Sequence, residues 1–211
     1  MGSVDASQFF VSLADLNGDS ISEIFAYGNT GVDIFPGQGN FRFGPATVLE
    51  HNFVSDIQVD DFDSDGSQDV IMSFGDSIAV VFGQSDGSFG NTRYFMVNST
   101  PTSSSTSFTI SDFDNDGYVD CAAASSDSTF NIWLNDGSGN LETNTIVNMP
   151  ISNTLGSGIS KFLNSDSIPD ILWRGSSLSV LAGTGISDFE LLHRLPIQFN
   201  FARRLQQRWR Y

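Results

Sequence analysis

Four short windows of the sequence carry carboxylate and amide side chains at a spacing typical of loops that bind a hard metal cation. The pattern is Asp-x-Asp/Asn-x-Asp-x-x-x-Asp/Glu, and the windows, called acidic windows 1 to 4, span residues 15–23, 61–69, 112–120 and 162–170. Windows 2 and 3 are complete, window 1 is a close variant, and window 4 begins with Phe162 instead of an acid. Because these windows hold 13 of the 25 acidic residues, a bound cation would relieve their mutual repulsion.

This pattern predicts five oxygen ligands in a window. Side chains at positions 1, 3, 5 and 9 and the backbone carbonyl at position 7 converge on one point, and glycine at position 6 permits the sharp turn. An all-oxygen set favours Ca²⁺ over zinc or copper, which prefer imidazole or thiolate ligands. The predicted ligands are Asp61, Asp63, Asp65, Ser67 and Asp69 in window 2; Asp112, Asp114, Asp116, Tyr118 and Asp120 in window 3; and Asp15, Asn17, Asp19, Ile21 and Glu23 in window 1. An Asp-rich turn without metal fits window 4.

An EF-hand is excluded as the source of this pattern. Its loop requires a bidentate glutamate at position 12 and a helix on each side. Position 12 is Ala26, Met72 or Ala123 in the first three windows, and the flanking runs are typical of strands. The windows are therefore predicted to be calcium loops between β-strands.

The windows also give the period of the architecture. They begin 46, 51 and 50 residues apart, and each lies among short apolar runs separated by polar or Gly-rich turns. In the first unit these runs cover residues 9–14, 24–27, 32–35 and 41–43, and they predict four strands. Four strands in a unit of about 50 residues are typical of a β-propeller blade, so the sequence predicts an all-β propeller of about four blades.

The predicted propeller covers residues 1–192, with units that begin near 5, 53, 104 and 155, and a basic tail follows at 193–211. Propellers close with about 4–8 blades, so four blades lie at the minimum. A small closed ring, self-association of chains to complete a ring, and part of a longer propeller all remain open, and the last is preferred. The tail holds five of the nine basic residues and is interpreted as a terminus outside any blade.

Composition and single residues exclude several classes of function. The formal charge of −16 argues against nucleic acid as a partner, because phosphates require a basic surface. No stretch approaches the ~18 apolar residues of a membrane span. The single cysteine, Cys121, lies in an apolar run and is predicted to be a buried thiol. Trp133 and Trp173 fall in strand-like runs and are predicted to be core residues.

With these windows the sequence resembles the FG-GAP/VCBS repeats of integrin α-chain-like propellers. The resemblance rests on the windows that begin at Asp15, Asp61 and Asp112 and on the Gly-rich segments 82–83 and 133–137, and it covers roughly residues 5–192. It implies a calcium-stapled propeller, extracellular or in the secretory lumen, that serves in adhesion or ligand binding. Similar propellers bind protein partners through loops on one face, and some fungal lectins of this type bind sugars between blades. The blade number and window 4 depart from the family pattern.

The sequence thus predicts a non-enzymatic, calcium-binding propeller for extracellular adhesion or for binding of a protein or carbohydrate ligand. His51 and His193 stand alone in turn-like and terminal contexts, so independent catalysis is not expected. Metal in the windows would be mainly structural and would couple calcium binding to folding. Two alternatives remain, an accessory segment of a secreted enzyme such as a hydrolase or lyase, and a non-functional fragment of a larger propeller.

Overall fold

The computed structural model describes residues 9–49, 53–97, 107–124, 129–148, 157–174, 177–185 and 188–196, in which every strand belongs to one of four antiparallel sheets. Sheet 1 contains β1 (Phe9–Ala14), β2 (Glu23–Gly28), β3 (Gly31–Phe35) and β4 (Thr47–Leu49). Sheet 2 contains β5 (Val54–Asp60), β6 (Asp69–Phe74), β7 (Ser77–Gly83) and β8 (Phe89–Met96). Sheet 3 contains β9 (Phe108–Ser111), β10 (Asp120–Ala124), β11 (Thr129–Asn135) and β12 (Leu141–Asn148). Sheet 4 contains β13 (Ser157–Lys161), β14 (Asp170–Arg174), β15 (Ser177–Gly185) and β16 (Asp188–Pro196).

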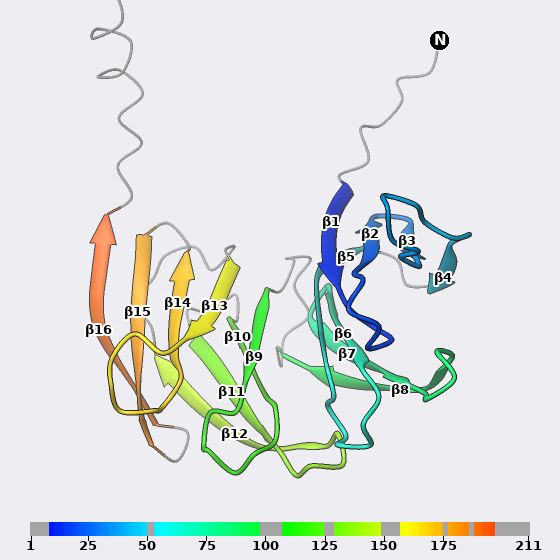
Figure 1. Ribbon diagram of the computed structural model, residues 1–211. Helices are drawn as coiled ribbons and strands as arrows, with labels where there is room; N and C mark the ends of the chain where they lie inside the picture. The colour runs from blue at the N-terminus through cyan, green and yellow to red at the C-terminus, as the bar shows by residue number, and fades with distance from the viewer. Residues whose placement is uncertain are drawn as a thin grey trace, which may run out of the picture.

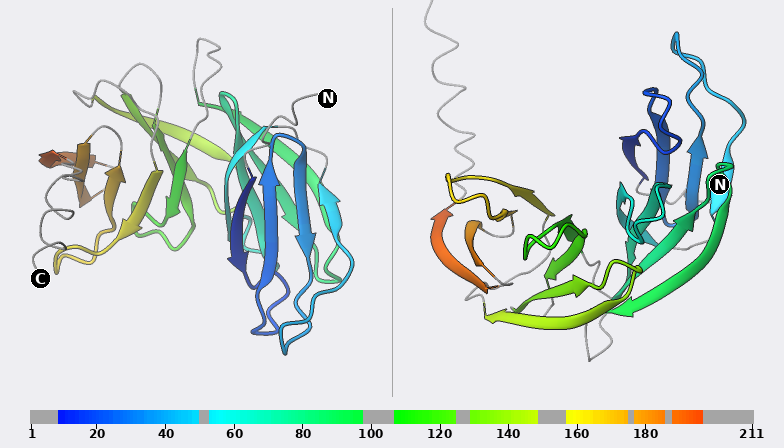
Figure 2. Two further views of the ribbon diagram at one scale, coloured as in Figure 1. Left: turned by 90° about the horizontal axis from the view of Figure 1, so that it is seen from above. Right: turned by 60° about the horizontal axis from the view of Figure 1, so that its bottom comes forward.

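Each sheet is an up-and-down meander, because its strands pair in sequence order. The sheets follow one another around an open arc, which Figure 1 and Figure 2 show from three directions. The first strands of neighbouring sheets contact each other, and β1, β5, β9 and β13 together line a hollow of about 510 Å³. The molecule is thus all-β, and its four sheets are the blades of a partial propeller, as the sequence predicted.

Apolar residues on both faces of the middle strands join the blades. Every residue of β7 after Ser77 is buried, because sheet 1 covers one face of sheet 2 and sheet 3 covers the other. Between sheets 3 and 4, the rings of Phe130 and Trp173 meet edge to face with centroids 5.0 Å apart. Burial on both faces explains why the central strands are continuously apolar instead of alternating.

The two ends of the arc expose apolar blade faces. On the outer face of sheet 1, Val11, Leu13 and Val48 are 67%, 64% and 58% exposed. Ile57 occupies in sheet 2 the place that Val11 occupies in sheet 1, and it is only 3% exposed because sheet 1 covers it. At the opposite end, Ile159 of β13 is 52% exposed. The end faces therefore have the character of blade interfaces.

Two predicted boundaries differ from the structure. The fourth strand of sheet 1 is β4 and not the run 41–43, which lies in a turn where Phe41 is fully exposed and has a φ of 58°. The turn forms because Gln38 N donates to Arg42 O and Arg42 N donates to Gly39 O. At the other end, β16 runs to Pro196, so residues 193–196 pair in sheet 4 instead of beginning the tail. The rest of the predicted tail, residues 197–211, lies outside the described residues.

Predictions about single core residues are confirmed. Cys121 is fully buried, and burial raises the pKa of its thiol, so the thiol stays protonated at neutral pH. Trp133 and Trp173 are buried at 7% and 0% exposure. His51 lies outside the described residues, and His193 lies in β16. None of the described segments forms a helix of the length and apolarity that crossing a membrane requires.

Candidate metal centre

Each acidic window connects the first strand of a sheet to the second. β5 ends at Asp60 and β6 begins at Asp69, so window 2 turns the chain between them. In the same way, window 3 follows Ser111 at the end of β9 and leads into β10 at Asp120. Because the first strands of all four blades run side by side, the topology brings the windows to the same side of the arc, the lower side in Figure 1.

The turn in each window requires a left-handed backbone at position 6. The φ angle there is 68° at Ser20, 88° at Gly66, 95° at Gly117 and 66° at Ser167. Glycine adopts this conformation without steric cost, whereas serine does not. The φ angle is also positive at position 4 of windows 1 to 3, at Gly18, Ser64 and Asn115, so every window holds one non-glycine residue in this conformation.

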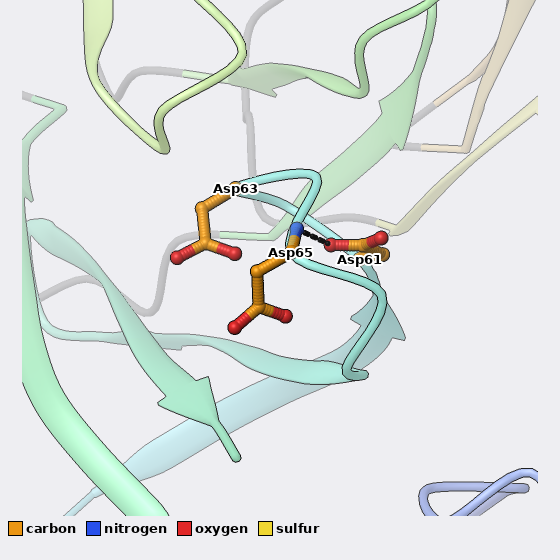
Figure 3. A group of neighbouring side chains, drawn as sticks. All are labelled: Asp61, Asp63 and Asp65. Carbon is orange, nitrogen blue, oxygen red and sulfur yellow. Dashed lines mark hydrogen bonds between the residues drawn. The ribbon is translucent and has the colours of Figure 1, made fainter. Parts of the chain in front are cut away.

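The structure brings together the side chains at positions 1, 3 and 5 of windows 2 and 3. In window 2, ligand atoms of Asp61, Asp63 and Asp65 all lie within 4.8 Å of one another. Figure 3 shows the carboxylates of Asp63 and Asp65 close together, while Asp61 lies on the other side of the loop and accepts the N–H of Asp65. The corresponding cluster of window 3 consists of Asp112, Asp114 and Asp116.

Backbone amides of the windows hold these carboxylates in place. Asp61 accepts hydrogen bonds from the N–H groups of Asp65 at 3.1 Å and Gly66 at 3.0 Å. Asp65 Oδ1 in turn accepts from Ser67 N at 2.7 Å. Window 3 repeats all three bonds at the corresponding positions, including the one from Tyr118 N. The acids at positions 1 and 5 are thus oriented by the loop itself.

The donor set of window 2 fits a hard cation. Asp63 Oδ1 is buried and has no hydrogen-bond partner among the described residues. Burial, followed by the nearby carboxylate of Asp65, raises the pKa of Asp63. The same causes raise the pKa of Asp114, whose neighbour is Asp116. A buried carboxylate oxygen without a donor is costly, and a cation held by these oxygens would satisfy it.

The position 9 carboxylates close their windows through hydrogen bonds that the sequence analysis missed. Asp69 Oδ2 accepts from Phe62 N at 2.8 Å, and Asp69 Oδ1 accepts from Gly83 N at 2.7 Å. Asp120 accepts two backbone bonds in the same way. Neither residue is among the acids of the 4.8 Å clusters. Position 9 therefore has a structural role apart from metal, and its predicted role as a ligand stays a prediction.

The same closure is present in the two incomplete windows, where Glu23 and Asp170 each accept two backbone bonds. Burial raises the pKa of Asp69 to about 6 and that of Asp120 to about 7, against the lowering effect of the backbone donors. Window 4 thus has the closing acid although it lacks an acid at position 1.

Windows 1 and 4 differ from the complete windows at the metal-facing positions. In window 1, Asp15 accepts from Gly18 N and Ser20 N, each at 2.8 Å, and the Oδ1 atom of Asn17 accepts from Asp19 N at 2.9 Å. Asp19 Oδ1 accepts the N–H of Ile21, the position 7 residue, at 2.7 Å, as in window 2. Window 1 therefore keeps the loop conformation with one carboxylate fewer.

Window 4 pairs its polar groups with one another. Phe162 occupies position 1 and is 65% exposed. Asn164 Nδ2 donates to Asp166 Oδ2 at 2.8 Å, and Asp166 N donates to Asn164 Oδ1 at 2.9 Å. Within the described part of the chain, no group of three acids gathers there. Its geometry is that of a turn without a metal-binding cluster.

Comparisons with known proteins agree with this architecture. A structure of a lectin of Agrocybe aegerita, described for its specific recognition of non-reducing terminal N-acetylglucosamine, matches with a TM-score of 0.67 and 20% identity. The match covers 93% of this chain and 54% of the lectin chain. A structure of BBS1N in complex with ARL6DN matches with a TM-score of 0.59 and 12% identity, over 92% of this chain and 57% of the other. These likenesses show the fold, and the chain spans little more than half of each structure.

A family comparison identifies the sequence signal behind the fold. No curated protein matches the chain. The model of the FG-GAP-like repeat matches residues 61–122, a stretch that runs from the first acid of window 2 through window 3. This is the segment in which both complete acid clusters lie. The chain therefore contains an FG-GAP-like repeat, set in a partial β-propeller.

Proposed function

We propose that the chain is a non-enzymatic binding module whose blades are held by Ca²⁺ in acidic windows 2 and 3, with a third ion in window 1. The observation that carries the calcium assignment is the buried, unpartnered Oδ1 atom of Asp63 within a cluster of three carboxylates. Bound Ca²⁺ would neutralise the negative charge of these carboxylates and give Asp63 Oδ1 a partner. The chain's own contribution is the set of backbone amides that orient positions 1 and 5, together with the position 9 carboxylate that ties the loop to the sheet.

The proposed site of action is outside the cell or in the secretory lumen. Extracellular calcium modules bind at about 10⁻⁴–10⁻³ M, so loops of this kind are filled where calcium is millimolar and are largely empty in the cytosol. Carboxylates whose ligand atoms all lie within 4.8 Å of one another repel each other, and a bound cation would relieve that repulsion. Secretion of the native protein, followed by its fractionation from cells, tests this placement. Recovery in the cytosolic fraction alone contradicts it.

The proposed ligand is a carbohydrate that stacks on Tyr118. The buried tryptophans leave no exposed indole at Trp133 or Trp173, whereas Tyr118 is 38% exposed at the end of window 3. A Cβ on Gly137 would lie 2.6 Å from Cζ of Tyr118, so the ring rests on the turn that carries Asp136 and Asn140. The polar side chains of this turn bond with one another, as Asn140 Nδ2 does with Asp136 Oδ2 at 3.1 Å, and the exposed ring beside the turn is the surface proposed for sugar stacking.

A glycan array tests this ligand. The chain in calcium should retain glycans that Tyr118→Ala does not, because the variant keeps the backbone carbonyl at position 7 while losing the ring. Tyr94→Ala is the matched control, since Tyr94 is 59% exposed on β8. If the chain binds no glycan and instead captures an extracellular protein in a Tyr118-independent way, the carbohydrate assignment is wrong and a protein ligand replaces it.

The end faces of the arc support a second part of the proposal, self-association to complete the ring. Asp33 is exposed on the outer face of sheet 1, where it pairs in register with Val48. Arg174 is exposed at the other end, two residues from Leu172, which pairs with Ile159. Opposite charges on two apolar faces favour head-to-tail contact between two copies of the chain.

A further inference from the structure

The side-chain amide of Asn135 joins windows 2 and 3 across the interface between sheets 2 and 3. Asn135 ends β11 and is 3% exposed. Its Nδ2 atom donates to the carbonyl oxygen of Phe62 at 2.7 Å and to that of Val119 at 3.0 Å. Phe62 is position 2 of window 2, and Val119 is position 8 of window 3. One amide group therefore bonds the backbones of two windows that begin 51 residues apart in sequence.

The orientation of this amide is fixed by its other contacts. Asn135 Oδ1 accepts from the N–H groups of Gly137 and Gly139, each at 3.1 Å. A flipped amide would place NH₂ against two N–H donors and oxygen against two carbonyls, so only one orientation satisfies all four bonds. From sheet 2, Arg93 Nη1 donates to Ser138 O at 2.6 Å and holds the same turn. The amide is thus rigid.

The turn that follows Asn135 also touches a predicted ligand residue of each window. A Cβ added to Gly139 would lie 3.4 Å from Cβ of Asp63, the position 3 acid of window 2. A Cβ added to Gly137 would lie 2.6 Å from the ring of Tyr118, at position 7 of window 3. The turn therefore fills the space between the two windows, so a displacement of either window would also displace the turn.

Asparagine stands here in place of a glycine found in the other blades. In each of those blades the glycine N–H donates to the position 9 carboxylate, as Asn135 N does to Asp120 at 2.8 Å. A Cβ on Gly83 would lie 2.1 Å from Gln68 O. Val119 holds the equivalent position in window 3, and its carbonyl accepts the hydrogen bond from Asn135 Nδ2 at 3.0 Å. The glycines that donate to the position 9 acids of sheets 1, 2 and 4 are Gly37, Gly83 and Gly183.

We propose that Asn135 is a positioning residue that couples windows 2 and 3, so that Ca²⁺ in one window raises the affinity of the other. The inference rests on the proposed calcium binding. An ion in window 2 orders the backbone between Asp61 and Asp63, and with it the carbonyl of Phe62. The rigid amide then also restrains the carbonyl of Val119, so window 3 loses less conformational entropy when it binds Ca²⁺. Windows 1 and 2 share no such bridge among the described residues, so they are not coupled.

Calorimetric titration of the full chain with CaCl₂ tests the coupling. Asp63→Ala disables window 2 because it removes the position 3 ligand, and Asp19→Asn in the same chain silences window 1. We expect the affinity of window 3 to be about fivefold lower in this chain than in one with window 2 intact, within the usual range of coupling between sites. In Asn135→Gly, which has the residue that the other blades use, disabling window 2 should leave the affinity of window 3 unchanged. Disabling window 1 with Asp19→Asn should leave window 3 unchanged in both backgrounds.

The outcomes separate this inference from the proposed function. Asn135→Asp keeps the Oδ1 acceptor for the turn but loses the donor to the two carbonyls, so it should uncouple the windows as glycine does. Coupling that persists in both variants, or two windows that bind independently in the unmodified chain, overturns the role of Asn135 and leaves calcium binding intact. A chain that binds no Ca²⁺ in either window overturns the proposed function together with the coupling.

Discussion

The backbone N–H of Gly83, at the end of β7, donates a 2.7 Å hydrogen bond to Asp69, at the start of β6. The equivalent bond recurs in all four sheets and involves the last acid of every window. The bond ties the window to the third strand of its own blade. The acid repeat therefore combines two functions, a cation cluster at positions 1, 3 and 5 and a hydrogen-bonded blade closure at position 9.

Replacing Gly83 should disrupt this closure. A Cβ in Gly83→Ala would lie 2.1 Å from Gln68 O, so the backbone of window 2 must shift to admit it. We expect a loss of about 2–4 kcal/mol in the free energy of unfolding, measured in urea. Gly87→Ala is the control, because its Cβ would meet open space and it bears only the strain of a φ of 80°, about 1 kcal/mol. Equal losses in the two variants would contradict the steric argument.

The two functions of the acids should separate in the presence and absence of calcium. Asp69→Asn places an amide NH₂ group beside the N–H donors of Phe62 or Gly83, so it should lower stability by about 2 kcal/mol in EGTA as well as in calcium. Asp63→Asn removes a charge from a crowded cluster, so it should lower stability in calcium only. Chemical denaturation under both conditions checks this. An Asp69 variant that loses stability only in calcium would make position 9 a metal ligand alone.

The pH dependence of stability should contain a contribution from Asp56 on β5. Burial raises the pKa of Asp56 to about 6 from an unfolded value of 3.8, against the lowering effect of the N–H groups of Ile57 and Phe108. Because the folded state then binds the proton more tightly, this carboxyl stabilises the fold below about pH 4, and the contribution disappears as pH rises to about 6. The difference amounts to at most about 3 kcal/mol.

Denaturation of Asp56→Asn and of the unmodified chain between pH 4 and 7 measures this contribution. The difference in unfolding free energy between the two proteins should change across that interval, since the variant lacks the titrating group. Parallel pH profiles would show that Asp56 titrates alike in the folded and unfolded states. Asp56 lies five residues before the first acid of window 2, so the comparison is made at constant calcium.

Self-association should depend on the exposed face of sheet 1. In calcium, light scattering after size-exclusion chromatography should give a mass that rises with concentration toward twice that of the chain. Leu13→Glu places a charge on a face where the side chain is 64% exposed, so it should leave folding intact and hold the protein as a monomer. Tyr94→Glu, at a 59% exposed position away from the end faces, is the control. A monomer at every concentration contradicts pairing of two copies.

The sequence predicted the blade architecture because its signals are local. The acid spacing, the apolar runs beside it and the period of about 50 residues identify the strands that flank each window. The fourth strand of sheet 1 could not be placed in this way. Phe41 and Phe43 have strand-forming side chains, but the hydrogen bonds of the turn from Pro36 to Gly44 decide their conformation.

Other parts of the site could not be predicted because they depend on contacts between distant residues. Asp69 meets Gly83 only after β6 and β7 pair, and nothing in the nine-residue pattern separates a closing acid from a ligand. The bond from Asn135 to Phe62 joins residues 73 positions apart and requires the packing of sheets 2 and 3. The sequence shows that the segment beginning at Trp133 is Gly-rich, but the bond from Asn135 to window 2 becomes apparent only from the packing of the sheets.

The most direct test of the account is the melting temperature of the chain in millimolar calcium and in excess EGTA. A site with a dissociation constant of about 10⁻⁴ M stabilises the fold by about 1.4 kcal/mol in 1 mM calcium, so two filled windows should raise the melting temperature by roughly 6–11 °C. The chain in which Asp19, Asp63 and Asp114 are all changed to Ala should melt at one temperature under both conditions. An unmodified chain whose melting curve is identical in calcium and in EGTA would contradict the calcium-stapled propeller.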